Sequence, residues 1–204
     1  ATTVIDGMRN GSVVTAIDVG STAWLEGFTL TNGSGRAIKV YPNPGQPSYY
    51  YDYYGGGMYN RNASLTITNC TLKNNSAIKG AGIYNDGSSI VITDCIFWNN
   101  LAINSLGIIS VSYGGGIFNL DSSPTIANCI FWVNKASYGG GIANAYSSPI
   151  ITNCAFGNNS ANPILPYGGS GIYCLGSSPI ISNCILWDSI STEIGIYPYE
   201  SGTP

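Results

Sequence analysis

The stretch from Gly114 to Asn134 decides the fold, and it reads GGGIFNLDSSPTIANCIFWVN. The same order returns 25 residues later, from Gly139 to Asn159, as GGGIANAYSSPIITNCAFGNN. Five times an Asn or Cys that ends a Gly-rich apolar stretch is followed ten residues later by a cysteine, in the pairs Asn60/Cys70, Asn85/Cys95, Asn119/Cys129, Asn144/Cys154 and Cys174/Cys184. The gaps between these pairs vary from 15 to 24 residues. A fixed step with variable gaps is typical of stacked repeats whose loops are inserted at one place.

Each copy contains three short segments with the pattern of β-strands. An Ile stands three residues before every one of these cysteines, and a Leu or Phe stands two residues after it. In a strand this spacing places Cys and the large apolar residue on one face. Glycines before Ile117 and its equivalents allow a tight corner, and Ser-Ser-Pro marks the next corner. The pattern predicts an all-β, three-sided parallel β-helix.

Stacked turns bring equivalent residues to about 4.8 Å from one another. We therefore expect inward ladders that run along the rod, one of Asn60, Asn85, Asn119 and Asn144 and one of Cys70, Cys95, Cys129, Cys154 and Cys184. The repeats predict six to seven turns in a single domain over residues 1–204. Insertions at 36–52, 104–112 and 162–166 all fall between the cysteine strand and the glycine strand, along one edge of the rod.

The composition excludes several classes of protein. Charged residues make up 8% and apolar residues 44%, which is too apolar for a disordered chain. A net charge of −3 and the lack of a basic cluster argue against nucleic acid as a partner. No apolar run is long enough for a transmembrane helix, so we expect no membrane insertion.

The reactive residue types do not assemble into a recognisable catalytic pattern. The chain has no histidine and no Cys-x-x-Cys, so a zinc site or a Ser-His-Asp triad is not expected. We interpret the six cysteines as buried free thiols. Asp86 and Asp121 are the best carboxylate pair, but both stand in turns where Asp is common anyway. We expect no catalytic residue, no metal, no cofactor and no enzyme activity; a polysaccharide lyase or hydrolase is the alternative.

The outward positions are more informative than the inward ones. After the cysteines they form an apolar stripe, and together with an aromatic loop they give the candidate binding residues Ile96, Trp98, Ile130, Trp132, Trp187, Tyr50, Tyr51, Tyr53 and Tyr54. Ala155 and Gly157 form a small-residue notch between Trp132 and Trp187. A second outward column holds Tyr59, Tyr84, Phe118, Ala143 and Tyr173. Contiguous exposed aromatic residues mark interaction surfaces, unless the inserted loops fold down and cover one stripe.

The motif Gly-Gly-x-Ile paired with Phe-x-x-Asn resembles a known group of proteins. It occurs at 114–117 with 131–134, and its second half returns at 97–100 and 156–159, with a near match at 72–75. Over residues 13–190 the chain resembles right-handed parallel β-helix repeat proteins, in particular the passenger repeats of polymorphic outer-membrane proteins. This resemblance implies a right-handed coil and a secreted or surface-exposed rod.

Two functions fit these observations. Neither end shows the polar cap that usually closes a solenoid, so we expect a structural protein that associates with other copies of itself into filaments, by end stacking and aromatic side contacts. The alternative is an adhesin or carbohydrate-binding segment of a larger surface protein, whose partners are surface proteins or glycans. Both hypotheses place the protein outside the cell or on its surface.

Overall fold

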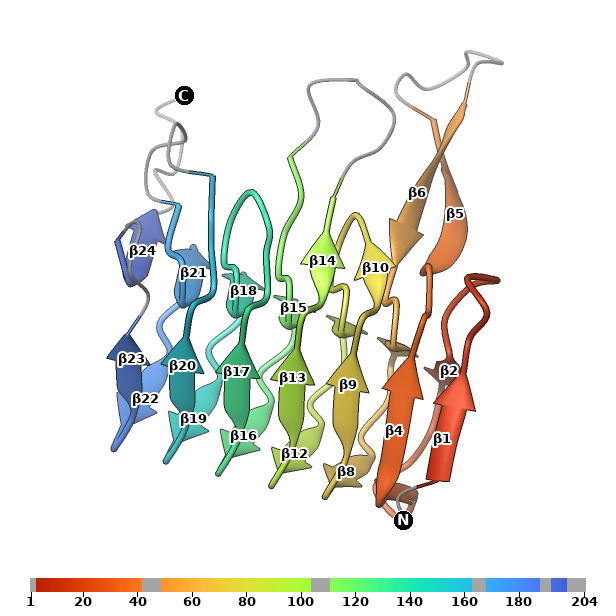
Figure 1. Cartoon of the computed structure of the whole chain (residues 1–204), viewed down its shortest axis with the longest axis horizontal. Coiled ribbons are helices and arrows are strands. Elements are labelled where there is room, and N and C mark those ends of the chain that lie inside the picture. Colours follow the sequence, from red (N-terminus) through yellow and green to blue (C-terminus); the bar gives the residue numbers. More distant parts are fainter. Residues whose placement is uncertain (1–2, 42–48, 104–110, 163–167, 188–191, 198–204) are drawn as a thin grey trace.

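The computed structural model of the chain describes residues 3–41, 49–103, 111–162, 168–187 and 192–197. These residues form a right-handed parallel β-helix with three sides, in which the chain coils from β1 at one end to β24 at the other (Figure 1). The described residues contain no helix. The predicted fold class is therefore confirmed.

Three long sheets make the sides of the coil, and all their strands pair in parallel. Sheet A contains β1 (Thr3–Asp6), β4 (Phe28–Thr31), β9 (Thr71–Lys73), β13 (Ile96–Trp98), β17 (Ile130–Trp132), β20 (Ala155–Gly157) and β23 (Ile185–Trp187). Sheet B contains β2 (Val14–Ile17), β7 (Met58–Arg61), β11 (Ile83–Asp86), β15 (Ile117–Leu120), β18 (Ile142–Ala145), β21 (Ile172–Leu175) and β24 (Ile194–Tyr197). Sheet C contains β3 (Trp24–Glu26), β8 (Thr66–Thr68), β12 (Val91–Thr93), β16 (Thr125–Ala127), β19 (Ile150–Thr152) and β22 (Ile180–Ser182).

Each turn visits sheet A, then sheet B, then sheet C. The described residues make six complete turns, followed by β23 and β24 of a seventh, as the repeats predict. The register matches the repeat, because Phe97 lies beside Phe131 and Asn85 lies beside Asn119. Equivalent positions of the sequence therefore become neighbours along the rod axis.

The core consists of ladders of identical or similar side chains. Phe97, Phe131 and Phe156 stack face to face with ring centroids 4.7 Å apart. The predicted Asn ladder is fully buried, and each amide donates to the next turn: Asn60 to Asn85 over 2.9 Å, Asn85 to Asn119 over 2.8 Å, and Asn119 to Asn144 over 2.9 Å. These bonds satisfy polar groups that would otherwise be costly inside an apolar core.

The corners follow directly from residue type. A single left-handed residue links sheet C to sheet A in the repeated turns, for example Asn128 with φ of 55° and Asn153 with φ of 53°. Asn tolerates this conformation better than other residues that carry a Cβ. At the entry to sheet B, Gly114 has φ of 63°, a value at which a side chain is strained.

Additional structure lies at the edge between sheets A and B, where the sequence places the insertions. β5 (Arg36–Val40) and β6 (Tyr50–Tyr54) form an antiparallel hairpin that projects from the rod (Figure 1). β10 (Ser76–Ala77) and β14 (Leu101–Ala102) pair in parallel further along this edge. Within the other predicted insertions, residues 104–110 and 163–166 lie outside the described residues.

Candidate functional site

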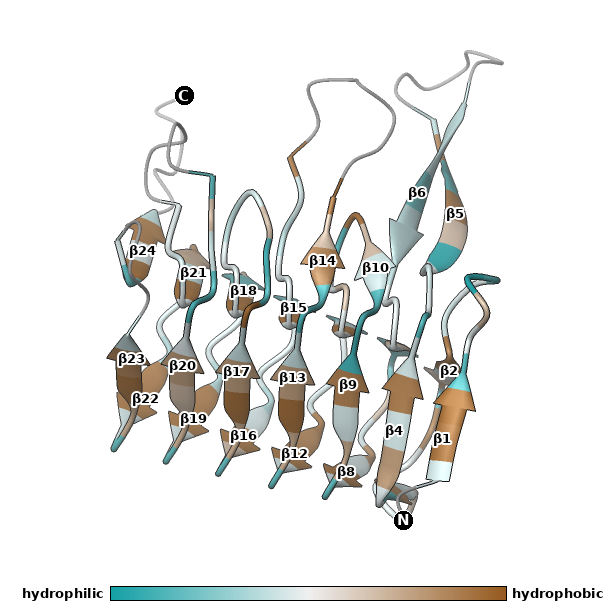
Figure 2. Ribbon diagram, in the orientation of Figure 1, coloured by the Kyte–Doolittle hydropathy of each residue, from teal (hydrophilic) through white to brown (hydrophobic). Residues whose placement is uncertain are grey.

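The outer face of sheet A carries the predicted Trp and Ile stripe. Trp98, Trp132 and Trp187 are 45%, 42% and 77% exposed, and Ile96, Ile130 and Ile185 beside them are exposed as well. In Figure 2 the ribbons of β13, β17, β20 and β23 are mostly brown, because these strands consist largely of apolar residues. A contiguous apolar surface of this kind is uncommon on a soluble monomer unless it has a partner.

The stripe is confined to the later turns of the rod. On β4 and β9 the outward positions of sheet A hold Thr29, Thr31, Thr71 and Lys73 in place of Ile and Trp. The change occurs between β9 and β13, where Thr71 lies beside Ile96 and Lys73 beside Trp98. The continuous part of this apolar face therefore covers β13, β17, β20 and β23, and the exposed Val4 on β1 is separated from it by the polar positions of β4 and β9.

The small-residue notch at Gly157 is occupied. A Cβ built on Gly157 would lie 2.2 Å from Cζ3 of Trp132, so the indole of Trp132 rests on the backbone of the next turn. Gly157 is buried as a result. The ring of Trp132 thus fills the small-residue notch expected between Trp132 and Trp187, because a long side chain can lean along the axis and cross one strand spacing of about 4.8 Å.

The second outward column is covered. Tyr59, Tyr84, Phe118, Ala143 and Tyr173 all point away from the coil but are at most 6% exposed. The residues that stand just before the Gly-rich segments fold over them: ring centroids lie 4.9 Å apart for Tyr54 and Tyr84, 5.5 Å for Tyr113 and Phe118, and 4.7 Å for Tyr138 and Tyr173. This column therefore forms a second hydrophobic cluster outside the coil and offers no free surface.

The hairpin has two chemically different faces. Register pairs Lys39 with Tyr51, and these side chains share the exposed face with Tyr49. Lys39 Nζ lies 4.4 Å from the centroid of the Tyr49 ring, a cation–π contact. On the opposite face, Ile38 and Tyr54 pack against the covered aromatic cluster. Tyr50 and Tyr53 are half-buried.

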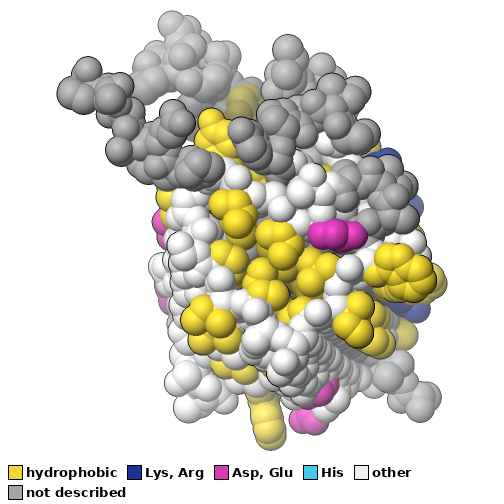
Figure 3. Space-filling view, turned by 90° about the vertical axis from the view of Figure 1, so that its left-hand side faces the viewer, with side chains coloured by type: hydrophobic (Ala, Val, Ile, Leu, Met, Phe, Trp, Pro, Cys, Tyr) yellow, Lys and Arg dark blue, Asp and Glu magenta, His cyan; other side chains and the backbone are white. Residues whose placement is uncertain are grey.

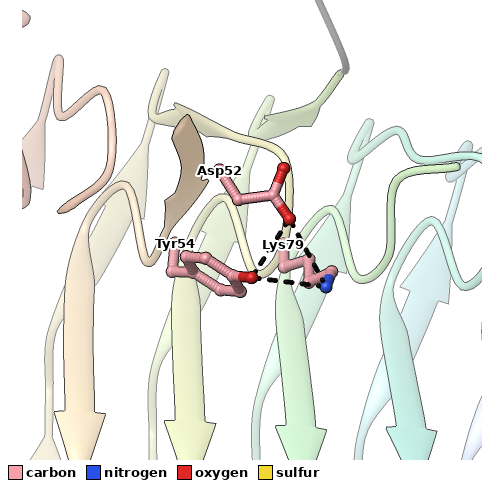
Figure 4. A network of polar contacts seen from close by, with 3 residues as sticks. All are labelled: Asp52, Tyr54 and Lys79. Carbon is pink, nitrogen blue, oxygen red and sulfur yellow. Dashed lines mark hydrogen bonds and ion pairs between the residues drawn. The ribbon is translucent and has the colours of Figure 1, made fainter. Parts of the chain in front are cut away.

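A buried polar network attaches the hairpin to the rod (Figure 4). The Tyr54 hydroxyl donates to Asp52 Oδ2 over 3.1 Å, and Lys79 Nζ lies 3.7 Å from the same oxygen. Burial, together with the negative charge of Asp52, raises the pKa of Tyr54 above its ordinary value. Tyr54 is 9% exposed and so lies outside the exposed binding surface expected for it, whereas Tyr51 is on that surface.

The side chains of the cysteine ladder pack in the hydrophobic core as small apolar groups. Cys70, Cys95, Cys129 and Cys154 are free and buried, and Cys184 is free and half-buried at the end of the ladder. Burial raises the pKa of the Cys184 thiol and keeps it protonated. Across the described ranges, no three His, Cys, Asp or Glu side chains gather closely enough to hold a metal.

The two carboxylates lie at the end of sheet B. Asp121 stands in the turn after β15, as expected, whereas the expectation of a turn was wrong for Asp86, which is the last residue of β11 and pairs with Leu120. Burial raises the pKa of Asp86, Arg61 opposes this shift and Asp121 adds to it, so the two carboxylates sense each other. Asp121 is exposed and has φ of 48°, which is a turn conformation that Asp adopts readily.

A second Asn ladder was not recognised as a ladder from the sequence. Asn75, Asn100, Asn134 and Asn159 are buried just beyond the ends of the sheet A strands. Asn100 donates to Asn134 Oδ1 over 3.0 Å and also to the carbonyl of Leu72 over 2.9 Å. The signal was present as the last position of Phe-x-x-Asn, whose amide closes the corner between sheets A and B.

Comparison with known families agrees with this geometry. The family described as right handed beta helix region matches residues 15–203. The chain belongs to this family. A search of curated proteins finds no match, and a search of solved structures finds none either. Among the described residues of this β-helix, no helix is long and apolar enough to cross a bilayer.

Proposed function

We propose that this β-helix is a non-catalytic structural rod that works outside the cell and associates with other copies of itself. The observation that carries the proposal is the exposed stripe of Trp98, Trp132 and Trp187 with its neighbouring Ile side chains. A flat aliphatic and aromatic face without charged groups suits a dry contact with another protein better than contact with water. The resemblance to surface passenger repeats supports the location.

The exposed area is large enough to form the apolar centre of such a contact. At about 250 Å² for a whole ring, the three indoles leave about 400 Å² of apolar surface exposed on each copy. The Ile side chains between them add to this area. A standard interface buries about 800 Å² on each partner, so the stripe supplies its apolar centre.

End stacking is the second contact in this proposal. Ile181, Cys184 and Leu186 are only half-buried, whereas their equivalents one turn earlier are fully buried. Figure 3 shows apolar side chains gathered on this end of the rod. Either further turns of chain or the first turn of another copy can cover such a surface, because both supply the next step of each ladder.

The stripe predicts a specific assembly defect. Replacing Trp98 and Trp132 with Ser removes about 220 Å² of exposed indole from each copy, about 5 kcal/mol at 25 cal/mol per Å². Sedimentation velocity and negative-stain electron microscopy at micromolar concentration should show oligomers for the native chain and single rods for the variant. Trp24→Ser is the matched control, since Trp24 is 75% exposed but lies on sheet C. Oligomers that survive in the double variant would contradict the role of the stripe.

An adhesin role is the second candidate, and the hairpin favours it. Tyr49, Tyr51 and Lys39 form an exposed face on an element that projects from the rod. Tyr provides a large contact area at low cost in side-chain entropy, as in antibody binding sites. Binding of the native chain to a surface protein or glycan, lost in Tyr49→Ser with Tyr51→Ser while assembly persists, would favour this role over self-association.

A further inference from the structure

The Trp stripe on sheet A has polar boundaries. Toward the first turn, the strand next to β13 presents Thr71 and Lys73 at the outward positions. Along the corner between sheets C and A, exposed amides form a chain of hydrogen bonds, in which Asn128 Nδ2 donates to Asp94 Oδ1 and Asn153 Nδ2 donates to Asn128 Oδ1, each over 3.2 Å. An apolar centre with a polar rim is the usual anatomy of a contact between two proteins.

The relief of the stripe is uneven along the rod axis. Its column nearer to sheet C holds Ile96, Ile130, Ala155 and Ile185 on successive strands. The three Ile side chains are exposed, whereas Ala155 is half-buried and leaves a gap in the column. In the column of indoles the equivalent position, Gly157, is covered by the ring of Trp132. The stripe therefore has one gap on β20 and one indole that leans toward its centre, between β17 and β20.

Two copies of the chain can bring this face together about a two-fold axis in two ways. If the rods run in the same direction, each strand lies opposite the same strand of the partner, so the two β20 strands leave an unfilled space between them. This arrangement also places Lys73 near the partner's Lys73, and like charges repel. If the rods run in opposite directions, β17 lies opposite β20 and β13 lies opposite β23. Ile130 then enters the gap at Ala155, and the two Trp132 rings meet beside the axis.

We propose that two copies pair through this stripe in opposite directions, about a two-fold axis that passes between β17 and β20. The inference rests on the proposed self-association and adds the geometry of its side contact. Ile130 and Ala155 stand on either side of the axis, so each copy inserts one Ile and receives one, as a two-fold contact requires. Lys73 lies beyond the partner's β23 and stays at the rim. The pair is closed with respect to this face, so further growth uses the ends of the rods.

The size and the rim of the face suit such a pair. Four strands at a spacing of about 4.8 Å make a face about 19 Å long, and the three indoles contribute about 400 Å² of apolar surface. A standard interface buries about 800 Å² on each partner, so the polar rim supplies much of the rest. In opposite directions the amides between sheets C and A lie over the same amides of the partner. Each amide is both a donor and an acceptor, so two identical rows can bond to each other.

The test places opposite charges on Ile96 and Ile185, which lie opposite each other only across the pair. Within one copy they stand on β13 and β23, three strand spacings or about 14 Å apart, too far for an internal ion pair. Ile96→Glu alone and Ile185→Lys alone each bury an unpaired charge, so each should raise the dissociation constant at least about thirtyfold in sedimentation equilibrium. The double variant joins the two charges across the contact and should bind within about fivefold of the native chain.

Sheet C supplies the matched control. Val91 and Ile180 are exposed on β12 and β22, which are also three strand spacings apart. Val91→Glu and Ile180→Lys introduce the same charges outside the stripe. Alone or together, they should leave the dissociation constant within about twofold of the native value, because substitutions on a free surface have small effects.

A further variant tests the gap on β20. Ala155→Leu fills the space that Ile130 of the partner enters, so it should weaken the proposed pair about tenfold. Rods that run in the same direction would respond with the opposite sign, because the larger side chain would fill the space between two facing β20 strands.

The outcomes separate this inference from the proposed function. If both single variants weaken association and the double variant does not recover, or if Ala155→Leu binds more tightly, self-association stands and the opposite direction is refuted. If the native chain stays monomeric at high micromolar concentration, or if the single variants are as neutral as the sheet C controls, both are refuted. Circular dichroism of each variant checks that the fold is intact before sedimentation.

Discussion

Replacing Asn119 with Ala should destabilise the rod strongly, because Asn119 stands in the middle of a buried ladder. Its amide donates to Asn144 Oδ1 over 2.9 Å and accepts from Asn85 Nδ2 over 2.8 Å, and the residue is fully buried. The variant leaves one donor and one acceptor unpaired, and each costs about 1–3 kcal/mol. The total, about 4 kcal/mol, corresponds to a fall in Tm of roughly 8–16 °C for a chain of this length.

Asn60 is the matched control, because it stands at the end of the same ladder. It donates to Asn85, but its own Oδ1 has no partner among the described residues, since Ala16 occupies the equivalent position in the first turn. Asn60→Ala removes the hydrogen bond to Asn85 but also removes the unpaired Oδ1 acceptor of Asn60 itself. Tm should therefore fall by no more than about 2–6 °C. Thermal unfolding followed by circular dichroism compares the two variants. An equal loss of Tm in both would refute the ladder argument.

Three further outcomes follow from the same geometry. Ala16→Asn should raise Tm by about 2–4 °C in a thermal melt, because the new amide can donate to the unpaired Oδ1 of Asn60; no gain would mean that the first turn has no room for it. Gly157→Ala should push the Trp132 indole into solvent and shift tryptophan emission to longer wavelength, while an unchanged spectrum would contradict their contact. Burial raises the pKa of Asp86 above 3.8, so the stability that its protonated form contributes is present below pH 3.8 and is lost as pH rises through the raised pKa. Asp86→Asn should therefore melt about 1–2 °C higher than the native chain at pH 7 and at the same temperature near pH 3.

The coil and its register are predictable from sequence because the ten-residue step of the repeat has the same length in every copy. The ten-residue step from Asn119 to Cys129 spans one corner of fixed length, so inward and outward positions follow from strand alternation alone. The exposed stripe at Trp98 and Trp132 is predictable for the same reason. Alternation states which way a side chain points from its own strand.

Strand alternation does not predict which side chains from other turns cover an outward residue. The exposure of the outward aromatic residues depends on that cover. Tyr84 points outward as expected, yet Tyr54 from the preceding turn covers it. Trp132 points outward as well, yet its ring crosses to Gly157 on the next turn.

The corner between sheets C and A, with its single left-handed residue, has the same length in every repeated turn, so the length of the rod depends on the number of turns. The repeated turns differ mainly in the loops at the edge between sheets A and B. They are interchangeable units, since each contributes one Phe, one Cys and one Asn to the same three ladders. Removing the 25-residue unit from Gly114 to Tyr138 would bring together two turns that already share this pattern. The rod would become shorter by one strand spacing, about 4.8 Å, and the two joined turns would make the same kinds of contact as before. Length is thus a quantity that this sequence can change in whole steps.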